Sequence, residues 1–332
     1  MKTLIIAEAG VNHNGDVNLA YKLCDAAKEA GADVVKFQTW RTELLLTEDV
    51  AQAEYQADNT GVSESQYDML KRLELSYEDF RKLKKHCDDI GITFASTADE
   101  ADSLDFLIGL GIPFIKIGSG EINNISYLRY MGSKGLPIIM STGMSTLEDV
   151  RDSVKALKEG GALDITLLHC TTNYPCPIDS VNLKAMDTLA KEFHLPVGYS
   201  DHTEGTVVPI AAAARGAAVI EKHFTLNKNM EGPDHKASME PKEFAEMVRG
   251  IRDIEKALGN GRKAPTSSER EISKVVKKRI VAKRDICRGH IISEADICVK
   301  RSNNGAAAKE WDAVIGAKAL KDYRADDGIV LY

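Results

Sequence analysis

The sequence predicts a (β/α)8 barrel followed by a small β-rich domain, and three observations lead to this prediction. Eight short apolar runs recur along the first 225 of the 332 residues. Segments with helical periodicity lie between most of these runs. After residue 261 the composition becomes polar and charged, and short β-like runs with turn residues follow. We therefore expect a barrel over residues 1–262, a linker over 263–279 and a second domain over 280–332.

The predicted strands are short runs rich in Val, Ile, Leu and Phe and bounded by Gly, Pro or polar residues. In chain order they are TLIIAEAG (3–10), ADVVKFQ (32–38), ITFAST (92–97), PFIKIGSG (113–120), PIIMSTG (137–143), ITLLHC (165–170), PVGYSDH (196–202) and VIEKHFT (219–225).

Two of the predicted helices have particularly clear signals. Residues 145–161 begin with Ser145 and Glu148 at capping-box spacing. Residues 241–259 begin at Pro241 and carry the clearest amphipathic pattern in the chain. These signals support the regular alternation of strand and helix.

One connection is too long for a plain barrel. The stretch from about Arg41 to Tyr77 separates the second and third predicted strands. Long connections in compact domains usually carry function. We therefore expect this stretch to contribute to a site.

Each predicted strand ends in polar or ionisable residues. In a (β/α)8 barrel the side chains at the C-terminal strand ends form the active site. One such residue could be accidental, because strand ends emerge into solvent, but eight ends together predict a site. The set comprises Glu8, Lys36, Gln38, Thr97, Lys116, Ser119, Glu121, Ser141, His169, Ser200, Asp201, His202, Glu221 and His223.

The eighth strand carries three consecutive ionisable residues, Glu221, Lys222 and His223. Burying a charge without a partner is costly, so such a strand indicates a site. Alternation places Glu221 and His223 on the same side, and His202 ends the neighbouring strand. A single histidine at a strand end is more often structural, whereas two on adjacent strands can bind one divalent metal and leave positions for water and substrate.

Lys36 and Lys116 lie inside apolar runs, which disfavours ordinary surface lysines. With the hydroxyl groups of Thr97, Ser119 and Ser141 nearby, they suit a phosphate or carboxylate ligand. Asp234 follows the eighth strand in a Gly-Pro turn, where turn formation is the simplest explanation.

Composition excludes several classes of protein. The formal net charge of −7 argues against nucleic-acid binding. The first apolar run is short and contains Glu8, so we expect no signal peptide, and no run reaches the length of a membrane helix. The six cysteines form no CxxC pair, as is typical of reduced thiols. We expect a cytoplasmic protein that binds neither nucleic acid nor membrane.

The motifs resemble those of the bacterial sialic acid synthases, which condense phosphoenolpyruvate with an N-acylated mannosamine-type sugar. The resemblance covers nearly the whole chain, and GYSDHT, EKHFT and GPDH in this order are highly specific. The tail is similar to the antifreeze-like (SAF) domain that ends these enzymes. The other matching motifs are AEAGVNHNG, VVKFQT, KIGSGEINN, STGM and HCTTNYPCP.

The resemblance implies roles for these residues. His202 and His223 would hold a divalent ion. Mn²⁺ is the expected ion, and Mg²⁺ and Co²⁺ are the alternatives. Glu8, Lys36 and Lys116 would be catalytic. The phosphoenolpyruvate pocket would comprise Lys36, Thr97, Lys116, Ser119, Ser141, Thr172 and Ser200. The sugar pocket would comprise Gln38, Glu121, Tyr174, Glu221, Asp234 and Arg301. The family also implies a domain-swapped homodimer in which the small domain brings Arg301 to the partner's sugar.

Three segments depart from the family pattern. Thr172 stands where some members have Asn, the STADEADS segment after the third strand lacks the common Pro-Phe, and VKRSNNG lacks the frequent Pro-Gly after Arg301. The first departure concerns one hydrogen bond in the phosphoenolpyruvate pocket, the second the position of the loop that carries Thr97, and the third the orientation of Arg301.

Several functions remain open from the sequence. Our first interpretation is an N-acetylneuraminate synthase that uses N-acetylmannosamine. The alternative is an N,N'-diacetyllegionaminate synthase that uses 2,4-diacetamido-2,4,6-trideoxymannose, because residues 53–76 are similar to a segment found in both kinds of enzyme. A Schiff-base aldolase and a non-catalytic carbohydrate-binding or ice-binding protein explain fewer of the residues.

Overall fold

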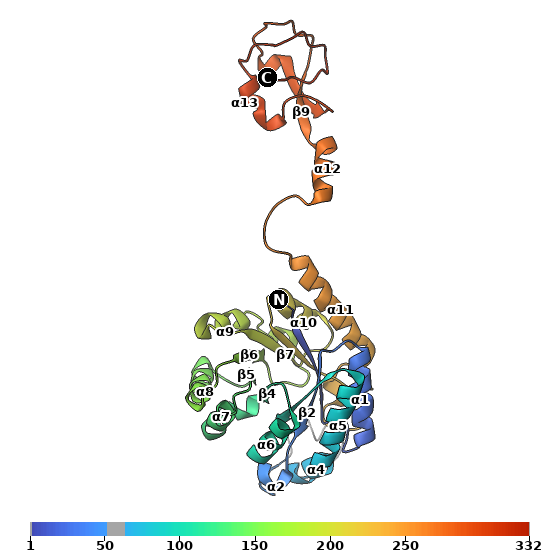
Figure 1. Cartoon of the computed structure of the whole chain (residues 1–332), viewed down its shortest axis with the longest axis vertical. Coiled ribbons are helices and arrows are strands. Elements are labelled where there is room, and N and C mark those ends of the chain that lie inside the picture. Colours follow the sequence, from blue (N-terminus) through green and yellow to red (C-terminus); the bar gives the residue numbers. More distant parts are fainter. Residues whose placement is uncertain (1, 52–63, 332) are drawn as a thin grey trace. The chain divides into compact units, whose positions relative to one another are not determined.

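The computed structural model describes residues 2–51 and 64–331. It divides the chain into two units, one ending at Gly259 and the other beginning at Asn260. In the first unit eight parallel strands close into a barrel, because β8 pairs with β1 as well as with β7. Helices surround the ring of strands (Figure 1). The predicted (β/α)8 barrel is confirmed.

The eight strands are short, and all are largely buried. They are β1 (Leu4–Gly10), β2 (Val34–Thr39), β3 (Thr93–Ala98), β4 (Ile115–Ile117), β5 (Ile138–Ser141), β6 (Ile165–Cys170), β7 (Val197–Asp201) and β8 (Val219–His223).

Most helices of this unit bury their apolar faces against the outside of the barrel, whereas Met69 and Leu73 pack with Val11 and Trp40 in a separate cluster. They are α1 (Val17–Glu29), α2 (Thr42–Leu45), α4 (Gln66–Leu73), α5 (Tyr77–Ile90), α6 (Ala101–Leu110), α7 (Ile125–Gly132), α8 (Leu147–Gly160), α9 (Ala185–Phe193), α10 (Val207–Ala214) and α11 (Pro241–Leu258). No described helix is long and apolar enough to cross a membrane.

The capping prediction for the helix after the fifth strand was wrong by one residue. The N-cap of α8 is Thr146, which forms a capping box with Asp149 rather than Ser145 with Glu148. Ser145 instead donates its hydroxyl to the carbonyl of Gly143, 2.9 Å away. Two overlapping Ser/Thr-x-x-acid patterns occur here, and this local hydrogen bond occupies the first of them.

A layer of mostly apolar side chains fills the interior of the barrel below its mouth. Its buried members are Ile6, Val34, Ala95, Phe114, Ile139, Leu168 and Val219. On β7 the corresponding position is Gly198. A Cβ atom there would lie 2.4 Å from the carbonyl oxygen of Val219, so only glycine fits.

The second unit has a core of its own, which includes Ile280, Ile297 and Tyr323. Its strands β9 (Lys278–Ala282) and β10 (Ile297–Arg301) pair antiparallel, and α13 (Trp311–Val314) follows. The stretch predicted as a linker contains a further helix, α12 (Ser267–Val276), which begins with a capping box between Thr266 and Glu269.

Candidate active site

A cavity of about 210 Å³ opens at the C-terminal ends of the barrel strands. Each strand or the loop that follows it contributes at least one side chain to its wall. The lining residues are Glu8, Lys36, Gln38, Thr97, Asp99, Lys116, Gly118, Ser119, Gly120, Ser141, Met144, Cys170, Thr172, Tyr174, Ser200, His202, Glu221 and His223.

Strand alternation accounts for the lower wall of this cavity. On every strand the lining residue follows the interior apolar layer by two positions, as Glu8 follows Ile6 and Lys36 follows Val34. The complete set of these residues is Glu8, Lys36, Thr97, Lys116, Ser141, Cys170, Ser200 and Glu221. The apolar layer thus supports a polar layer directly above it.

Two lysines and two glutamates form a buried network in this polar layer. Lys36 Nζ lies 2.6 Å from Glu8 Oε2 and donates to Thr97 Oγ1 at 2.9 Å. Lys116 Nζ lies 3.4 Å from Glu221 Oε1 and donates to Ser141 Oγ at 2.8 Å. All four charged side chains are less than a tenth exposed. Buried charges are tolerated when they are paired in this way.

The pKa values of this network follow from burial and from the neighbouring charges. Burial raises the pKa of the Glu8 carboxyl although Lys36 opposes this. Burial opposes ionisation of Glu221 as well, but Lys116 and Lys36 lower its pKa to about 2. Burial also lowers the pKa of Lys116. The pKa values of Glu8 and Glu221 are therefore shifted in opposite directions, which is a feature of acid–base sites.

Two imidazole rings lie side by side at the ends of β7 and β8. The centroids of His202 and His223 are 5.4 Å apart, and the ring of Tyr174 packs against both. The Nδ1 atom of His202 lies 2.8 Å from the carbonyl oxygen of Thr171, which leaves Nε2 for a ligand. Buried Nδ1 of His223 has no hydrogen-bond partner in the described chain and lies 3.8 Å from Asp234 Oδ2.

This donor set is suitable for a metal ion with two protein ligands. Burial, and then the proximity of His202, lowers the pKa of His223 well below its usual value, so this ring is neutral, as metal ligation requires. Burial opposes the charged form of His202 as well, but its hydrogen bond with Cys170 raises its pKa, so a metal ion would have to displace a proton there. The described residues contain no group of three or more His, Cys, Asp or Glu side chains that could hold a metal.

A second pocket of about 140 Å³ shares Gln38, Tyr174 and His223 with the first. Asp234, predicted from the turn after β8, lies here, and burial raises its pKa to about 6. One wall is apolar and comes partly from α4, inside the long connection after β2. The remaining lining residues are Val11, Met69, Leu70, Leu73 and Pro233. The expectation that this connection contributes to a site concerned residues 41–77, of which 52–63 lie outside the described chain.

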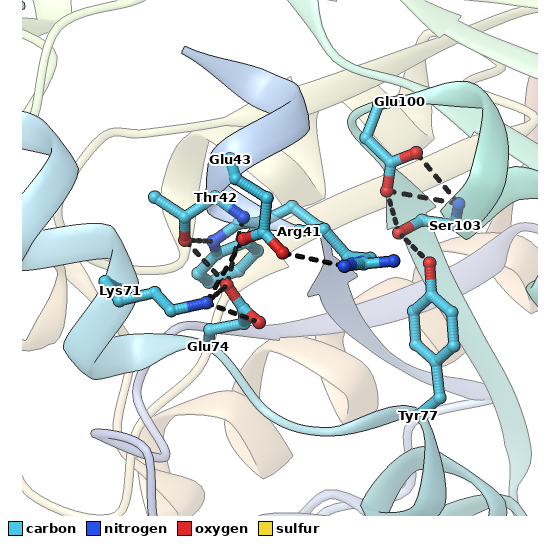
Figure 2. Close-up of polar contacts among 9 residues, drawn as sticks. Arg41, Thr42, Glu43, Lys71, Glu74, Tyr77, Glu100 and Ser103 are labelled. Atoms are coloured by element: carbon cyan, nitrogen blue, oxygen red, sulfur yellow. Dashed lines mark hydrogen bonds and ion pairs between the residues drawn. The ribbon is translucent and has the colours of Figure 1, made fainter. Parts of the chain in front are cut away.

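Hydrogen bonds tie α4 to the beginning of the same connection (Figure 2). Glu74 accepts from the backbone N–H and the hydroxyl of Thr42, at 2.9 and 2.7 Å. Lys71 bridges Glu43 and Glu74. This network fixes the helix that supplies the apolar wall.

Two strand-end residues expected on the rim point elsewhere. His169 bonds the carbonyl of Val181 and lines a neighbouring cavity, whereas Cys170 takes the interior position. Asp201 is fully buried and pairs with Lys222 Nζ at 2.6 Å. This ion pair explains how the eighth strand accommodates Lys222, while Glu221 and His223 face the mouth.

Two other predicted residues do not line the cavity. Glu121 is half-buried in the short helix η1 (Ser119–Glu121) and accepts from Asn124 Nδ2 at 2.8 Å. Arg301 is exposed at the end of β10 in the second unit. Asp99 and Cys170 line the cavity and were missed. Counting two residues on from Leu168 identifies Cys170, whereas Asp99 lies beyond the strand and alternation gives no signal for it.

The fold and the cavity define a (β/α)8-barrel enzyme whose mouth offers lysines and hydroxyl groups beside two imidazoles. A family model described as the NeuB family matches residues 23–263, and one for the SAF domain matches residues 278–331. The chain belongs to the NeuB family.

Individual relatives extend this comparison over nearly the whole chain. An N,N'-diacetyllegionaminic acid synthase of Legionella pneumophila is 50% identical over 322 residues, 96% of this chain and 90% of the relative. The Campylobacter jejuni enzyme of the same name is 47% identical and covers 98% of each chain. A crystal structure of an N-acetylneuraminic acid synthetase from Leptospira borgpetersenii, in complex with citrate, has a TM-score of 0.73 and 34% identity and covers 82% of this chain and 90% of its own.

Proposed function

We propose that this protein condenses phosphoenolpyruvate with open-chain 2,4-diacetamido-2,4,6-trideoxymannose to give N,N'-diacetyllegionaminate and phosphate. The observation that carries the proposal is the near-full-length identity of 50% and 47% to two synthases of that product. It favours the alternative sugar over N-acetylmannosamine, our first interpretation. The similarity to an N-acetylneuraminic acid synthetase supports the same class of reaction.

The lower cavity suits phosphoenolpyruvate, which carries a phosphate and a carboxylate. Lys36 and Lys116 would supply positive charge, and buried hydroxyl groups would donate hydrogen bonds. Ser119 Oγ accepts from the backbone N–H of Gly143 at 2.9 Å, which holds this hydroxyl group at the wall of the cavity. The other hydroxyl groups of this pocket are Thr97, Ser141, Thr172 and Ser200.

The second pocket suits the sugar. Gln38, Tyr174 and Asp234 offer polar groups there, whereas Leu70 and Leu73 belong to an apolar wall. Contact with an apolar wall costs free energy when it removes a hydroxyl group from water without a hydrogen-bond partner. A methyl group at carbon 6 would avoid this cost, whereas a hydroxymethyl group would not. This lining agrees with a 6-deoxy sugar.

The chemistry requires a proton donor, an anion site and a means of polarising the aldehyde. Carbon 3 of phosphoenolpyruvate bonds to the aldehyde carbon, water adds at carbon 2, and phosphate leaves as the bond between carbon 2 and its oxygen breaks. Glu8, whose pKa is raised, would exchange protons with water or with the sugar oxygen. A divalent ion held by His202 and His223 would supply Lewis-acid polarisation of the aldehyde oxygen.

We further propose a domain-swapped homodimer in which Arg301 reaches the N-acyl group of the sugar bound by the other barrel. The exposed position of Arg301 leaves it free for such a contact. Mixing inactive Lys36→Met and Arg301→Ala proteins under subunit exchange should restore activity, because one hybrid site then has both residues. No restoration would contradict action between subunits.

The use of phosphoenolpyruvate, a cytoplasmic metabolite, supports a cytoplasmic location.

The reaction is tested by supplying phosphoenolpyruvate with each sugar in parallel and following phosphate release and product mass. We expect turnover with the diacetamido sugar, its loss on chelation and its return with Mn²⁺. Lys36→Met should abolish it, and the matched control Lys85→Met, whose side chain is 75% exposed, should not. Preference for N-acetylmannosamine would return the protein to sialate synthesis. Borohydride trapping of a sugar–lysine adduct without metal dependence would indicate an aldolase.

A further inference from the structure

The Asp234 carboxylate lines the pocket assigned to the sugar, and its Oδ2 atom lies 3.8 Å from Nδ1 of His223. Asp234 belongs to the segment GPDH (232–235), which follows β8 and is not part of any strand. Strand pairing therefore does not set the direction of this side chain. Its direction depends on the contacts that hold the loop.

A first anchor directly follows Asp234. The ring of His235 is fully buried, and burial lowers its pKa to about 4, so one nitrogen donates and the other accepts. Asn14 donates its Nδ2 to the carbonyl of Glu231 at 2.7 Å, which leaves Oδ1 to accept from His235 Nε2 at 3.2 Å. Nδ1 of His235 then accepts from the hydroxyl of Thr225 at 2.7 Å. These bonds join the loop after β8 to the loop after β1.

A second anchor holds the backbone of Asp234 itself. Ser238 donates its hydroxyl to the Asp234 carbonyl at 2.6 Å. Asn12 Nδ2 donates to Ser238 Oγ at 2.8 Å and to the carbonyl of Phe224 at 2.9 Å. Asn12 and Ser238 are each 1% exposed. Both anchors therefore start from the segment VNHNG (11–15), whose asparagines have no role in the chemistry described above.

Gly232 provides the space for the first anchor. Its φ is +150°, and a Cβ atom there would lie 2.6 Å from both Asn14 Oδ1 and His235 Cδ2. A larger residue would separate the two side chains that bond each other. The GPDH segment thus combines a glycine that permits close approach, a histidine that anchors the loop and a carboxylate that faces the pocket.

We propose that Asn12, Asn14 and His235 are positioning residues that hold the Asp234 carboxylate in place for a hydrogen bond to the acceptor sugar. This proposal rests on the proposed function, which places the sugar in the pocket that Asp234 lines. None of these three described residues lines either pocket, so their effect on the sugar would pass through Asp234.

The test is a double-variant cycle of Asp234→Ala and His235→Ala in steady-state kinetics at saturating Mn²⁺. Asp234→Ala should raise the KM for the diacetamido sugar about 10- to 100-fold, as for loss of one hydrogen bond to a charged group. We expect about a 10-fold increase for His235→Ala. The double variant should lie within about twofold of Asp234→Ala, because residues that act through one group are not additive. The KM for phosphoenolpyruvate should change less than about twofold in all three.

Two further variants separate positioning from folding. Asn14→Ala removes the acceptor for His235 and should raise the sugar KM as His235→Ala does. His235→Gln can still donate to Asn14 and should recover part of the loss. A variant that is partly unfolded loses active enzyme and therefore apparent kcat, whereas the KM of the folded fraction is unchanged. The matched control is Asn18→Ala, which removes an exposed asparagine bonded to Asp16 and should leave both KM values unchanged.

Four results would overturn the inference while the proposed function stands. They are an unchanged sugar KM in Asp234→Ala or in His235→Ala, a full 10-fold effect of His235→Ala in the Asp234→Ala background, a larger shift in the phosphoenolpyruvate KM than in the sugar KM, and weaker Mn²⁺ binding in calorimetry as the main effect. Absence of wild-type turnover with either sugar would overturn both.

Discussion

The buried ion pair between Lys222 and Asp201 provides the most direct test of how the site is supported. Both side chains are at most 2% exposed, and their charged atoms are 2.6 Å apart. Removing one partner of a buried pair typically costs about 3–5 kcal/mol. In Lys222→Met, Asp201 keeps its hydrogen bonds from the N–H and hydroxyl of Thr203, at 3.0 and 2.9 Å. We therefore expect a loss near the lower limit, about 3 kcal/mol.

The free energy of unfolding should be measured by urea denaturation. The chain has two compact units, so a single two-state transition cannot be assumed. Its two tryptophans are Trp40 in the barrel and Trp311 in the second unit. In a Trp311→Phe background the fluorescence of buried Trp40 reports on the barrel alone.

The control is Lys85→Met, which removes an exposed partner of Asp89 and should leave the free energy of unfolding nearly unchanged, because exposed ion pairs contribute little. A loss below about 1 kcal/mol in Lys222→Met would refute the reasoning, because it would mean that Thr203 alone compensates the buried carboxylate. Asp201 and Lys222 each directly precede one of the two histidines. We therefore also expect weaker Mn²⁺ binding by this variant in calorimetry.

Three further predictions concern packing, metal and pH. Gly198→Ala should destabilise the barrel by about 3 kcal/mol in urea, because the new methyl group would overlap the carbonyl of Val219; wild-type stability would contradict this. His223→Ala should abolish Mn²⁺ binding in calorimetry, and unaltered binding would place the metal elsewhere. The pKa of Asp99 is raised to about 7 from 3.8, so wild-type stability should fall as pH rises through this interval. Asp99→Asn lacks this titration, and its stability relative to the wild type should increase between pH 4 and pH 8.

Most of the fold and the lower wall of the cavity could be predicted from the sequence because both depend on strand alternation. The eight runs and the helices between them identify the barrel, and the strand ends identify Glu8, Lys36 and Lys116. On the sixth strand the same rule leaves a choice, because the consecutive residues His169 and Cys170 face opposite sides of the strand. His169 is the more reactive residue by type. Leu168, however, faces the barrel interior, so Cys170, two residues further on, faces the cavity.

The remaining parts of the site depend on contacts that one strand does not encode. Lys222 is compatible with burial only because Asp201 on the adjacent strand pairs with it. Asp99 and Asp234 lie beyond strand ends, where loop geometry rather than alternation sets direction. Arg301 belongs to a separate unit, so no local pattern can relate it to the barrel.

The pairing of lysines with glutamates explains how the site could respond to its anionic substrate. Lys36 contacts Glu8 at 2.6 Å and opposes the effect of burial on the Glu8 pKa. A phosphate bound by Lys36 would weaken that pairing and add negative charge nearby. Burial and the charge of Glu221 would then dominate, and both favour the protonated form of Glu8. Binding of phosphoenolpyruvate would thus prepare the proton donor that the proposed condensation needs.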